Sequence, residues 1–567
     1  MKAVKGYQSC AFFSEELKLE DIFTKEDFLP EHQMIADTAA NFVEQELFPV
    51  MSDIEKQNFT ILKQMVKKSG ELGLLGIDIP EKYGGTELDK ISAIIITEQM
   101  ARSRSFSITY SGQIGIGSLP IVYYGSDEQK KKYLPSVASG EMIGAYALTE
   151  PDAGTDALGI RTIATLSEEG THYILNGEKQ FITNASFADF FILYAKIDGE
   201  QFTAFIIDKD AQGLSIGPEE QKMGLKGTST ASIVLNEVRV PVENVLGEKG
   251  KGHLIAFNIL NIGRHKISAA CLGTAKQSLK LTVSYVKERK QFKRLLSEFK
   301  LTKEKIAIMA AKIFAMESMV YRTAGEFEKG ADYAKRNGIP FRNLLKVYAL
   351  ESSVNKVFSS EALDYIVDES LQLHGGYGFI SDYEIETLYR DSRINRIFEG
   401  TNEINRLVIA NTIVRNIDEF VIERNLKEGY SKLLEHEWKL LHYFKEYTLH
   451  FVKDVKESYA NTAEEQELLS KIADYTILIY AMESCLIRLE KLLHRKSRHK
   501  IIYQQNLAKA FIKEASIEFL SKVFSAPIHT KKLKEIVSTL VAEIPRMDGI
   551  VEKRQIATAV IEKGSYE

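Results

Sequence analysis

The chain has 567 residues, with 73 Lys and Arg against 78 Asp and Glu, and a formal net charge of −5. This length predicts several domains, and the near balance of charge gives no general attraction to nucleic acid. A hydrophobic content of 44% is typical of a protein with sizeable buried cores, and the sequence contains no run of about 18 apolar residues that would predict a membrane span.

Cysteine usage and the N-terminal residues indicate the compartment. Cys10, Cys271 and Cys485 lie far apart and lack the spacing of metal ligands, so we expect neither a disulfide framework nor a metal site. A reducing cytoplasm is the simplest location for such a chain. The first residues lack an apolar core segment, so we expect no signal peptide.

The first part of the chain is predicted to be helical. Residues 1–25 predict a loosely held arm, and residues 26–145 predict an N-terminal helical domain with apolar residues at helical spacing. Small residues at Ser111, Gly112 and Gly115 predict a groove along one helix face. Close packing between helices explains this spacing equally well.

The periodicity changes near residue 146. Short apolar runs at 181–183, 190–194, 202–207 and 233–235, separated by turn residues, predict strands. Asn176-Gly177 predicts a tight hairpin turn. We therefore expect a β domain, a barrel or a sandwich, over residues 146–247.

Helical patterns return after this β domain. Apolar residues between Ile306 and Val320 step by three and four positions, as a buried helical stripe does. We expect a four-helix bundle over residues 248–415 and an additional helical domain over residues 416–567. The predicted fold class is therefore α+β and mostly α, in the order helical domain, β domain, helical bundle, extra helical domain.

The motif RDSRINRIFEGTNEINR at residues 390–406 holds the candidate catalytic residue, Glu399. Gly400 lets the chain bend after Glu399, and Thr401 can cap a new helix. A carboxylate held against the preceding apolar pair would have a raised pKa and could accept a proton. The alternative is a solvated acid paired with the neighbouring arginines.

Two further motifs accompany this one. Residues 372–379 (QLHGGYGF) form a glycine loop, and residues 147–159 (ALTEPDAGTDALG) form a small-residue turn with hydroxyl donors at Thr149 and Thr155. Shorter matches follow in order at 176–184, 222–224, 238–241 and 289–292. Over residues 30 to 412 the chain resembles the acyl-CoA dehydrogenases, and its C-terminal extension resembles the very-long-chain branch of that family.

The resemblance implies FAD as cofactor. The sequence contains no strand-linked G-x-G-x-x-G, and the family holds FAD between the β domain and the C-terminal helices, with help from a neighbouring subunit. Gln372 and Gly376 would reach across from that subunit. Arg289 considered alone would be a surface charge. The residues implied at the cofactor are Tyr146, Leu148, Thr149, Phe181, Thr183, Arg289, Phe292, Gln372, Gly376, Thr401 and Glu403.

The resemblance also implies the reaction. Glu399 would take the α-proton of an acyl-CoA while the β-hydrogen leaves as hydride to the flavin, giving a trans-2-enoyl-CoA as in the first step of fatty-acid β-oxidation. Some relatives carry the base at the position of Gly263, which has no side chain to abstract a proton. Thr155, Gly112, Arg264 and Gly400 are the implied substrate contacts. A glycine at 112 would leave room for a long acyl chain.

The implied partners are an electron-transferring flavoprotein and a second copy in a homodimer. The basic run KLLHRKSRHK at residues 491–500 could contact the inner face of a membrane, although a solvated helix face explains it equally well. Two other functions remain open: an acyl-CoA oxidase that reduces oxygen, and a scaffold that keeps the fold without catalysis. Phe181 and Thr387 depart from the usual family residues.

Overall fold

A computed structural model describes residues 11–14, 18–420, 431–527, 529–544 and 549–567. Cys10 and the rest of the predicted arm over residues 1–10 and 15–17 lie outside the described part. Two compact units divide the chain. The first contains Met1–Phe28, Ile267–Lys329 and Val347–Glu567, and the second contains Leu29–Lys266 and Gly330–Lys346.

The second unit begins with helices that share one apolar core. That core contains side chains such as Phe42, Leu62, Ile96 and Phe106. Asp89 fixes the start of one helix, because its carboxylate accepts a hydrogen bond from the Ser92 amide at 2.7 Å. The main helices are α2 (Pro30–Phe42), α3 (Met51–Glu55), α4 (Phe59–Glu71), α5 (Lys90–Met100), α6 (Ser105–Gly112), α7 (Leu119–Tyr124) and α8 (Asp127–Ser139).

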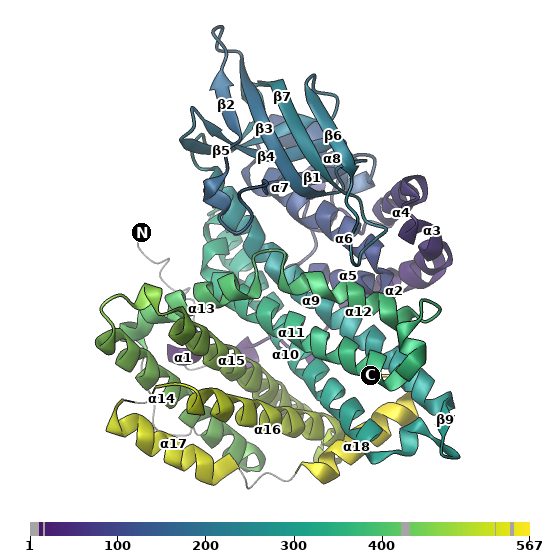
Figure 1. Cartoon of the computed structure of the whole chain (residues 1–567), viewed down its shortest axis with the longest axis vertical. Helices are drawn as coiled ribbons and strands as arrows, with labels where there is room; N and C mark the ends of the chain where they lie inside the picture. The colour runs from purple at the N-terminus through teal and green to yellow at the C-terminus, as the bar shows by residue number, and fades with distance from the viewer. Residues whose placement is uncertain (1–10, 15–17, 421–430, 528, 545–548) are drawn as a thin grey trace. The chain divides into compact units, whose positions relative to one another are not determined.

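The same unit contains the sheet (Figure 1). Its strands follow the order β6-β7-β3-β2-β4-β5-β8, and β1 pairs with β4 in parallel. The inner strand β4 is almost wholly buried, as expected of a continuous apolar run covered on both faces. The strands are β1 (Gly144–Ala147), β2 (Ile163–Leu166), β3 (His172–Thr183), β4 (Phe190–Ile197), β5 (Gln201–Asp208), β6 (Leu214–Glu219), β7 (Thr230–Pro241) and β8 (Val245–Leu246).

The predicted hairpin at Asn176-Gly177 is wrong. Strand β3 continues through these two residues, and its register against β7 shifts between Leu175 and Gly177. A Cβ at Gly177 would lie 2.5 Å from the Thr162 hydroxyl, so the glycine permits a close approach between strands. The pair therefore forms a bulge inside a long strand, which is the other common use of glycine in a sheet.

The first unit is built mainly from long helices. Helix α9 (Gly252–Glu288) crosses the boundary between the units, as does α10 (Lys300–Arg336). The others are α11 (Ala349–His374), α12 (Glu384–Ser392), α13 (Asn402–Asn416), α14 (Glu435–Ser458), α15 (Gln466–Arg495), α16 (Ile502–Phe524), α17 (Lys531–Glu543) and α18 (Ile550–Lys563), with a strand pair β9 (Lys290–Gln291) and β10 (Arg294–Leu295). Helix α13 packs along both α11 and α15. Across the part of the chain that the structure describes, every helix is too short or too polar to span a bilayer.

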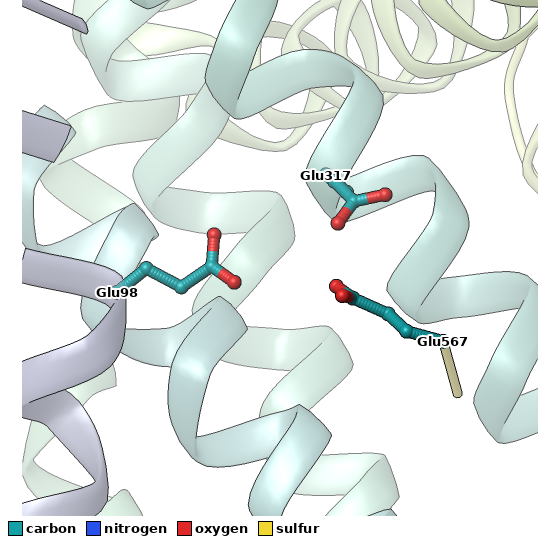
Figure 2. Close-up of side chains that lie close together, drawn as sticks. All are labelled: Glu98, Glu317 and Glu567. Carbon is teal, nitrogen blue, oxygen red and sulfur yellow. The ribbon is translucent and has the colours of Figure 1, made fainter. Parts of the chain in front are cut away.

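A buried ion network joins distant segments of the first unit. Arg488 of α15 forms ion pairs with Glu317 of α10 at 2.7 Å and with Glu26 at 2.8 Å. Lys276 of α9 lies 2.5 Å from Glu317 and 2.6 Å from Glu567. Figure 2 shows the carboxylates of Glu317 and Glu567 facing each other. Because Lys25 and Lys276 each pair with both of these acids, the cluster is a network of ion pairs.

The basic run at residues 491–500 contributes to similar contacts. Lys491 is buried, where its ammonium donates to the Ile22 carbonyl at 2.6 Å and pairs with Asp27. Arg495 pairs with the same carboxylate at 2.5 Å. Because Lys491 is buried and paired, it cannot contribute to the predicted membrane contact. That contact stays a prediction for the exposed residues from Arg495 to Lys500.

Candidate functional site

Glu399 lies on a tight turn before α13. Glu399 and Gly400 both adopt positive φ angles, +55° and +82°. The Thr401 hydroxyl accepts a hydrogen bond from the Ile404 amide at 3.3 Å, which confirms the predicted helix cap. A left-handed glutamate costs on the order of 1 kcal/mol and persists only where its surroundings fix it. This turn therefore holds a half-buried carboxylate in a defined direction.

Two other predicted residues flank this carboxylate. Thr401 is half-buried and Glu403 is exposed in the first turn of α13. The amide at the helix start and the Thr401 hydroxyl lower the pKa of Glu403 below its ordinary value. Glu403 is therefore held as a carboxylate at a helix N-terminus.

The glycine loop lines an open pocket in the first unit. The pocket measures about 620 Å³ and is lined by Arg289, Gln372, Gly376 and their neighbours. A Cβ at Gly375 or Gly376 would meet nothing within 4 Å, so the backbone is open to close approach. The Arg289 guanidinium lies 5.3 Å from the centre of the Tyr377 ring. Phe292 is 88% exposed and does not line this pocket.

The second unit brings together the other predicted cofactor residues. Tyr146 and Leu148 are buried at the end of β1, and Thr149 and Thr183 are half-buried. The Gln180 amide donates to the Thr149 carbonyl at 2.9 Å, which joins β3 to the segment after β1. Phe181 has a φ of +59° and is 57% exposed, so its ring presents an open apolar surface.

A buried ion pair supports this junction. The Lys179 ammonium lies 2.7 Å from the Glu150 carboxylate and donates to the Leu148 carbonyl at 3.3 Å. Glu150 also accepts from the Thr162 hydroxyl at 2.5 Å and the Arg161 amide at 2.6 Å. Burial lowers the pKa of Lys179 to about 8, although Glu150 opposes this shift. Burial raises the pKa of Glu150, but the charge of Lys179 and the hydrogen bond from the Arg161 amide outweigh it, so the pKa lies below its ordinary value.

Sequence reasoning did not single out this pair, although both residues lie inside the quoted motifs. We expect Lys179→Met to lower the free energy of unfolding by about 3–5 kcal/mol, because it leaves the Glu150 carboxylate buried and unpaired. We also expect FAD to be retained less well, because Leu148 and Thr149 lose their support. Chemical denaturation and the FAD content of the purified variant measure these two effects.

The pH dependence of this variant follows from the depressed pKa. Between about pH 8 and pH 10.5 the folded wild type binds fewer protons at Lys179 than the unfolded chain does. Its stability relative to Lys179→Met should therefore rise across that range, by at most about 3 kcal/mol. A constant difference across the range would contradict the assignment of the depressed pKa to Lys179.

The predicted substrate residues have different surroundings. Thr155 is exposed, and Arg264 is buried in α9, where it donates to the Asn261 side chain at 3.1 Å. A Cβ at Gly112 would lie 3.1 Å from the Asn184 amide nitrogen, so this glycine allows close packing. A Cβ at Gly115, although this residue is buried, would meet nothing within 4 Å. Open space therefore lies beside Gly115.

Each unit carries features that fit part of an FAD molecule. The open Phe181 surface beside Thr149 suits a flat, largely apolar ring with polar edges. The glycine backbone beside Arg289 suits an anionic diphosphate, because amides and a guanidinium both donate to phosphate oxygens. These two regions include most of the residues expected at the cofactor.

Comparison with known proteins gives the family. Profiles of the acyl-CoA dehydrogenase N-terminal, middle and C-terminal domains match residues 29–141, 145–238 and 250–414, and a further C-terminal domain profile matches 453–525. The chain is 45% identical to a probable acyl-CoA dehydrogenase of Bacillus subtilis, over 100% of this chain and 99% of that protein. It is 37% identical to a short-chain specific acyl-CoA dehydrogenase of Clostridium acetobutylicum, over 68% of this chain and 98% of that protein.

A solved structure extends this similarity to the whole chain. An acyl-CoA dehydrogenase complexed with FAD from Bacillus anthracis is 44% identical, with a TM-score of 0.92 over 99% of this chain and 100% of that chain. The match includes the additional helical domain, which the relatives aligned over 68% of this chain do not cover. The chain therefore belongs to the acyl-CoA dehydrogenase family of FAD-dependent oxidoreductases, in a form that carries an additional C-terminal helical domain.

Proposed function

We propose that the protein dehydrogenates long-chain acyl-CoA thioesters to trans-2-enoyl-CoA, with Glu399 as the base. The observation that carries this proposal is the turn at Glu399, where two left-handed residues and a capped helix aim a half-buried carboxylate. Gly263 leaves the alternative position for a base without a proton acceptor.

The protein's own groups account for the proton transfer. Glu399 takes the α-proton, and the backbone at Glu399 and Gly400 holds the thioester in line for that transfer. Arg264 and Thr155 stay predicted substrate contacts. Bound FAD supplies the hydride acceptor, and Tyr146, Leu148, Thr149, Phe181, Thr183, Arg289, Phe292, Gln372, Gly376, Thr401 and Glu403 are the residues we propose to hold it.

Open space near the small-residue helix supports a long acyl chain. Asn184 lies against Gly112, whereas Gly115 faces open space. Gly112 stays a predicted substrate contact, and we propose that Gly115 lines the acyl site. In anaerobic titrations with butyryl-, octanoyl- and palmitoyl-CoA, we expect palmitoyl-CoA to bleach the flavin band most completely. Gly115→Leu should shift this preference toward butyryl-CoA. An optimum at butyryl-CoA in the wild type would contradict the long-chain assignment.

The electron acceptor and the reaction direction need a separate measurement. We propose an electron-transferring flavoprotein as acceptor. Oxygen consumption at the same rate as acyl-CoA oxidation would instead indicate an oxidase.

A relative from Clostridium sporogenes, 38% identical over 68% of this chain, is a 3-(aryl)acrylate reductase. The reverse reaction is therefore the second candidate, and net reduction of an enoyl-CoA by a reduced flavoprotein would support it.

We further propose a homodimer. Phe379, at the end of the glycine loop, and Phe292 are 86% and 88% exposed, so two large apolar side chains lie uncovered on the first unit. A second copy would cover these side chains and bring its own Gln372 and Gly376 to the cofactor.

The proposed function also includes a role in fatty-acid β-oxidation and a cytoplasmic location, with peripheral membrane contact through residues 495–500.

A further inference from the structure

The turn at Glu399 is held from inside the first unit by two side chains. The Lys356 ammonium of α11 donates to the Gly400 carbonyl at 2.9 Å, and the Asn405 amide of α13 donates to the same oxygen at 2.8 Å. Lys356 also donates to the Asn402 side-chain oxygen at 2.7 Å. Both Lys356 and Asn405 are fully buried. The carbonyl that follows the candidate base therefore has two buried donors.

Burying a lysine at this position is energetically costly. A buried ammonium requires oxygen partners, and an apolar side chain of similar length would fill the same space without that cost. Here the ammonium donates to the Gly400 carbonyl of the turn and to the Asn402 side-chain oxygen. The ammonium therefore stabilises the position of the Gly400 carbonyl and of the Asn402 side chain.

We infer that Lys356 is a positioning residue for catalysis, acting through the Gly400 carbonyl on the direction of the Glu399 side chain. This inference rests on the proposed role of Glu399. The left-handed angles at Glu399 and Gly400 are strained for the glutamate, and such strain persists only where surrounding contacts fix it. Lys356 and Asn405 are two such contacts, in addition to the Thr401 cap. Without them the turn can relax, and misplacing a base by about 1 Å can cost about 100-fold in rate.

A second layer fixes Asn402 in turn. Its amide donates to the Ser360 hydroxyl at 3.1 Å and to the Glu361 carboxylate at 3.0 Å. Glu361 pairs with Arg406 at 2.8 Å, and Arg406 also pairs with Asp474 of α15 at 2.8 Å. Helix α15 lies within the additional C-terminal domain. The contacts behind the turn thus continue from α11 and α13 into that domain.

The test is Lys356→Met in the full-length protein loaded with FAD. We expect kcat with palmitoyl-CoA to fall about 10- to 100-fold, with little change in the affinity for the acyl-CoA. In a Glu399→Gln background, Lys356→Met should lower kcat little further, because both changes impair the same function, proton abstraction by Glu399. Asn405→Leu removes the second donor and should lower kcat in the same direction.

Lys491→Met is the matched control. Like Lys356, Lys491 is buried and donates to a backbone carbonyl, that of Ile22, and its second partner is the Asp27 carboxylate. It should lower the melting temperature while leaving kcat near the wild-type value. A folded, FAD-containing Lys356→Met with wild-type kcat, or losses that multiply in the double variant, would overturn the inference. Failure of the wild type to oxidise any acyl-CoA would instead overturn the proposed function.

Discussion

Replacing Glu399 by Gln is expected to slow reduction of the bound flavin by acyl-CoA by about 100- to 10,000-fold. A general base in position contributes a factor of this size, and glutamine keeps the shape of the side chain but cannot accept the proton. The turn should survive, because its angles depend on Gly400, the Thr401 cap and the donors to the Gly400 carbonyl. The variant should stay yellow and bind substrate. Stopped-flow absorbance after anaerobic mixing with palmitoyl-CoA measures the rate.

Glu386→Gln is the control for this substitution. Glu386 lies on α12 and forms an ion pair with Arg390 at 2.7 Å, one turn along the same helix. Such a partly exposed pair contributes at most about 1 kcal/mol, so its loss should leave the bleaching rate close to that of the wild type. Rapid bleaching by Glu399→Gln would assign the base to another residue.

Local sequence rules predicted the surroundings of Glu399 well. The small residue at 400 and the hydroxyl at 401 are strong signals for a bend and a helix start, because each acts within a few residues. The structure places a positive φ at Gly400 and a cap at Thr401. The order of helical, sheet and helical segments also follows from apolar spacing, and the family comparison confirms that order. The roles of the individual site residues stay predictions.

The prediction of a hairpin at Asn176-Gly177 was wrong because a local turn preference is overridden by pairing with a strand distant in sequence. Two strand-like runs around Asn-Gly favour a two-residue turn when the chain is considered alone. In the sheet, β7 pairs with both halves of β3, and the Asn176 side chain accepts from the Glu237 amide at 2.8 Å. A partner strand some 60 residues away along the sequence thus converts the turn signal into a bulge.

Buried lysines were also beyond sequence reasoning. Lys179 and Lys356 lie in stretches that carry no special charge pattern, and a lysine is expected on the surface. Their partners, Glu150 and the Gly400 carbonyl, lie 29 and 44 positions away. Arg488 and Glu26 are 462 positions apart. Such contacts depend on the folded arrangement of elements, so apolar spacing and local motifs do not show which residues will pair.

Glu317→Gln is expected to lower the free energy of unfolding by about 3–5 kcal/mol, because it removes the central carboxylate of a buried network. Lys25, Lys276 and Arg488 all pair with Glu317, and their charges hold its pKa well below the ordinary value despite burial. The stability that this group contributes is present above its ordinary pKa and is lost as the pH falls. Denaturant midpoints at neutral pH measure the loss.

Two variants separate the network from ordinary surface charge. Tyr566→Phe removes one hydroxyl that donates to Glu317 at 3.1 Å and should cost about 1 kcal/mol. Glu326→Gln, on the same helix α10, removes a partly exposed pair with Lys329 at 3.3 Å and should change stability by less than about 0.5 kcal/mol. If Glu317→Gln and Glu326→Gln shift the midpoint equally, Glu317 does not hold these segments together. A large effect confined to Glu317 would instead show that the segment around Lys25 and helices α9, α10 and α15 depend on one buried charge.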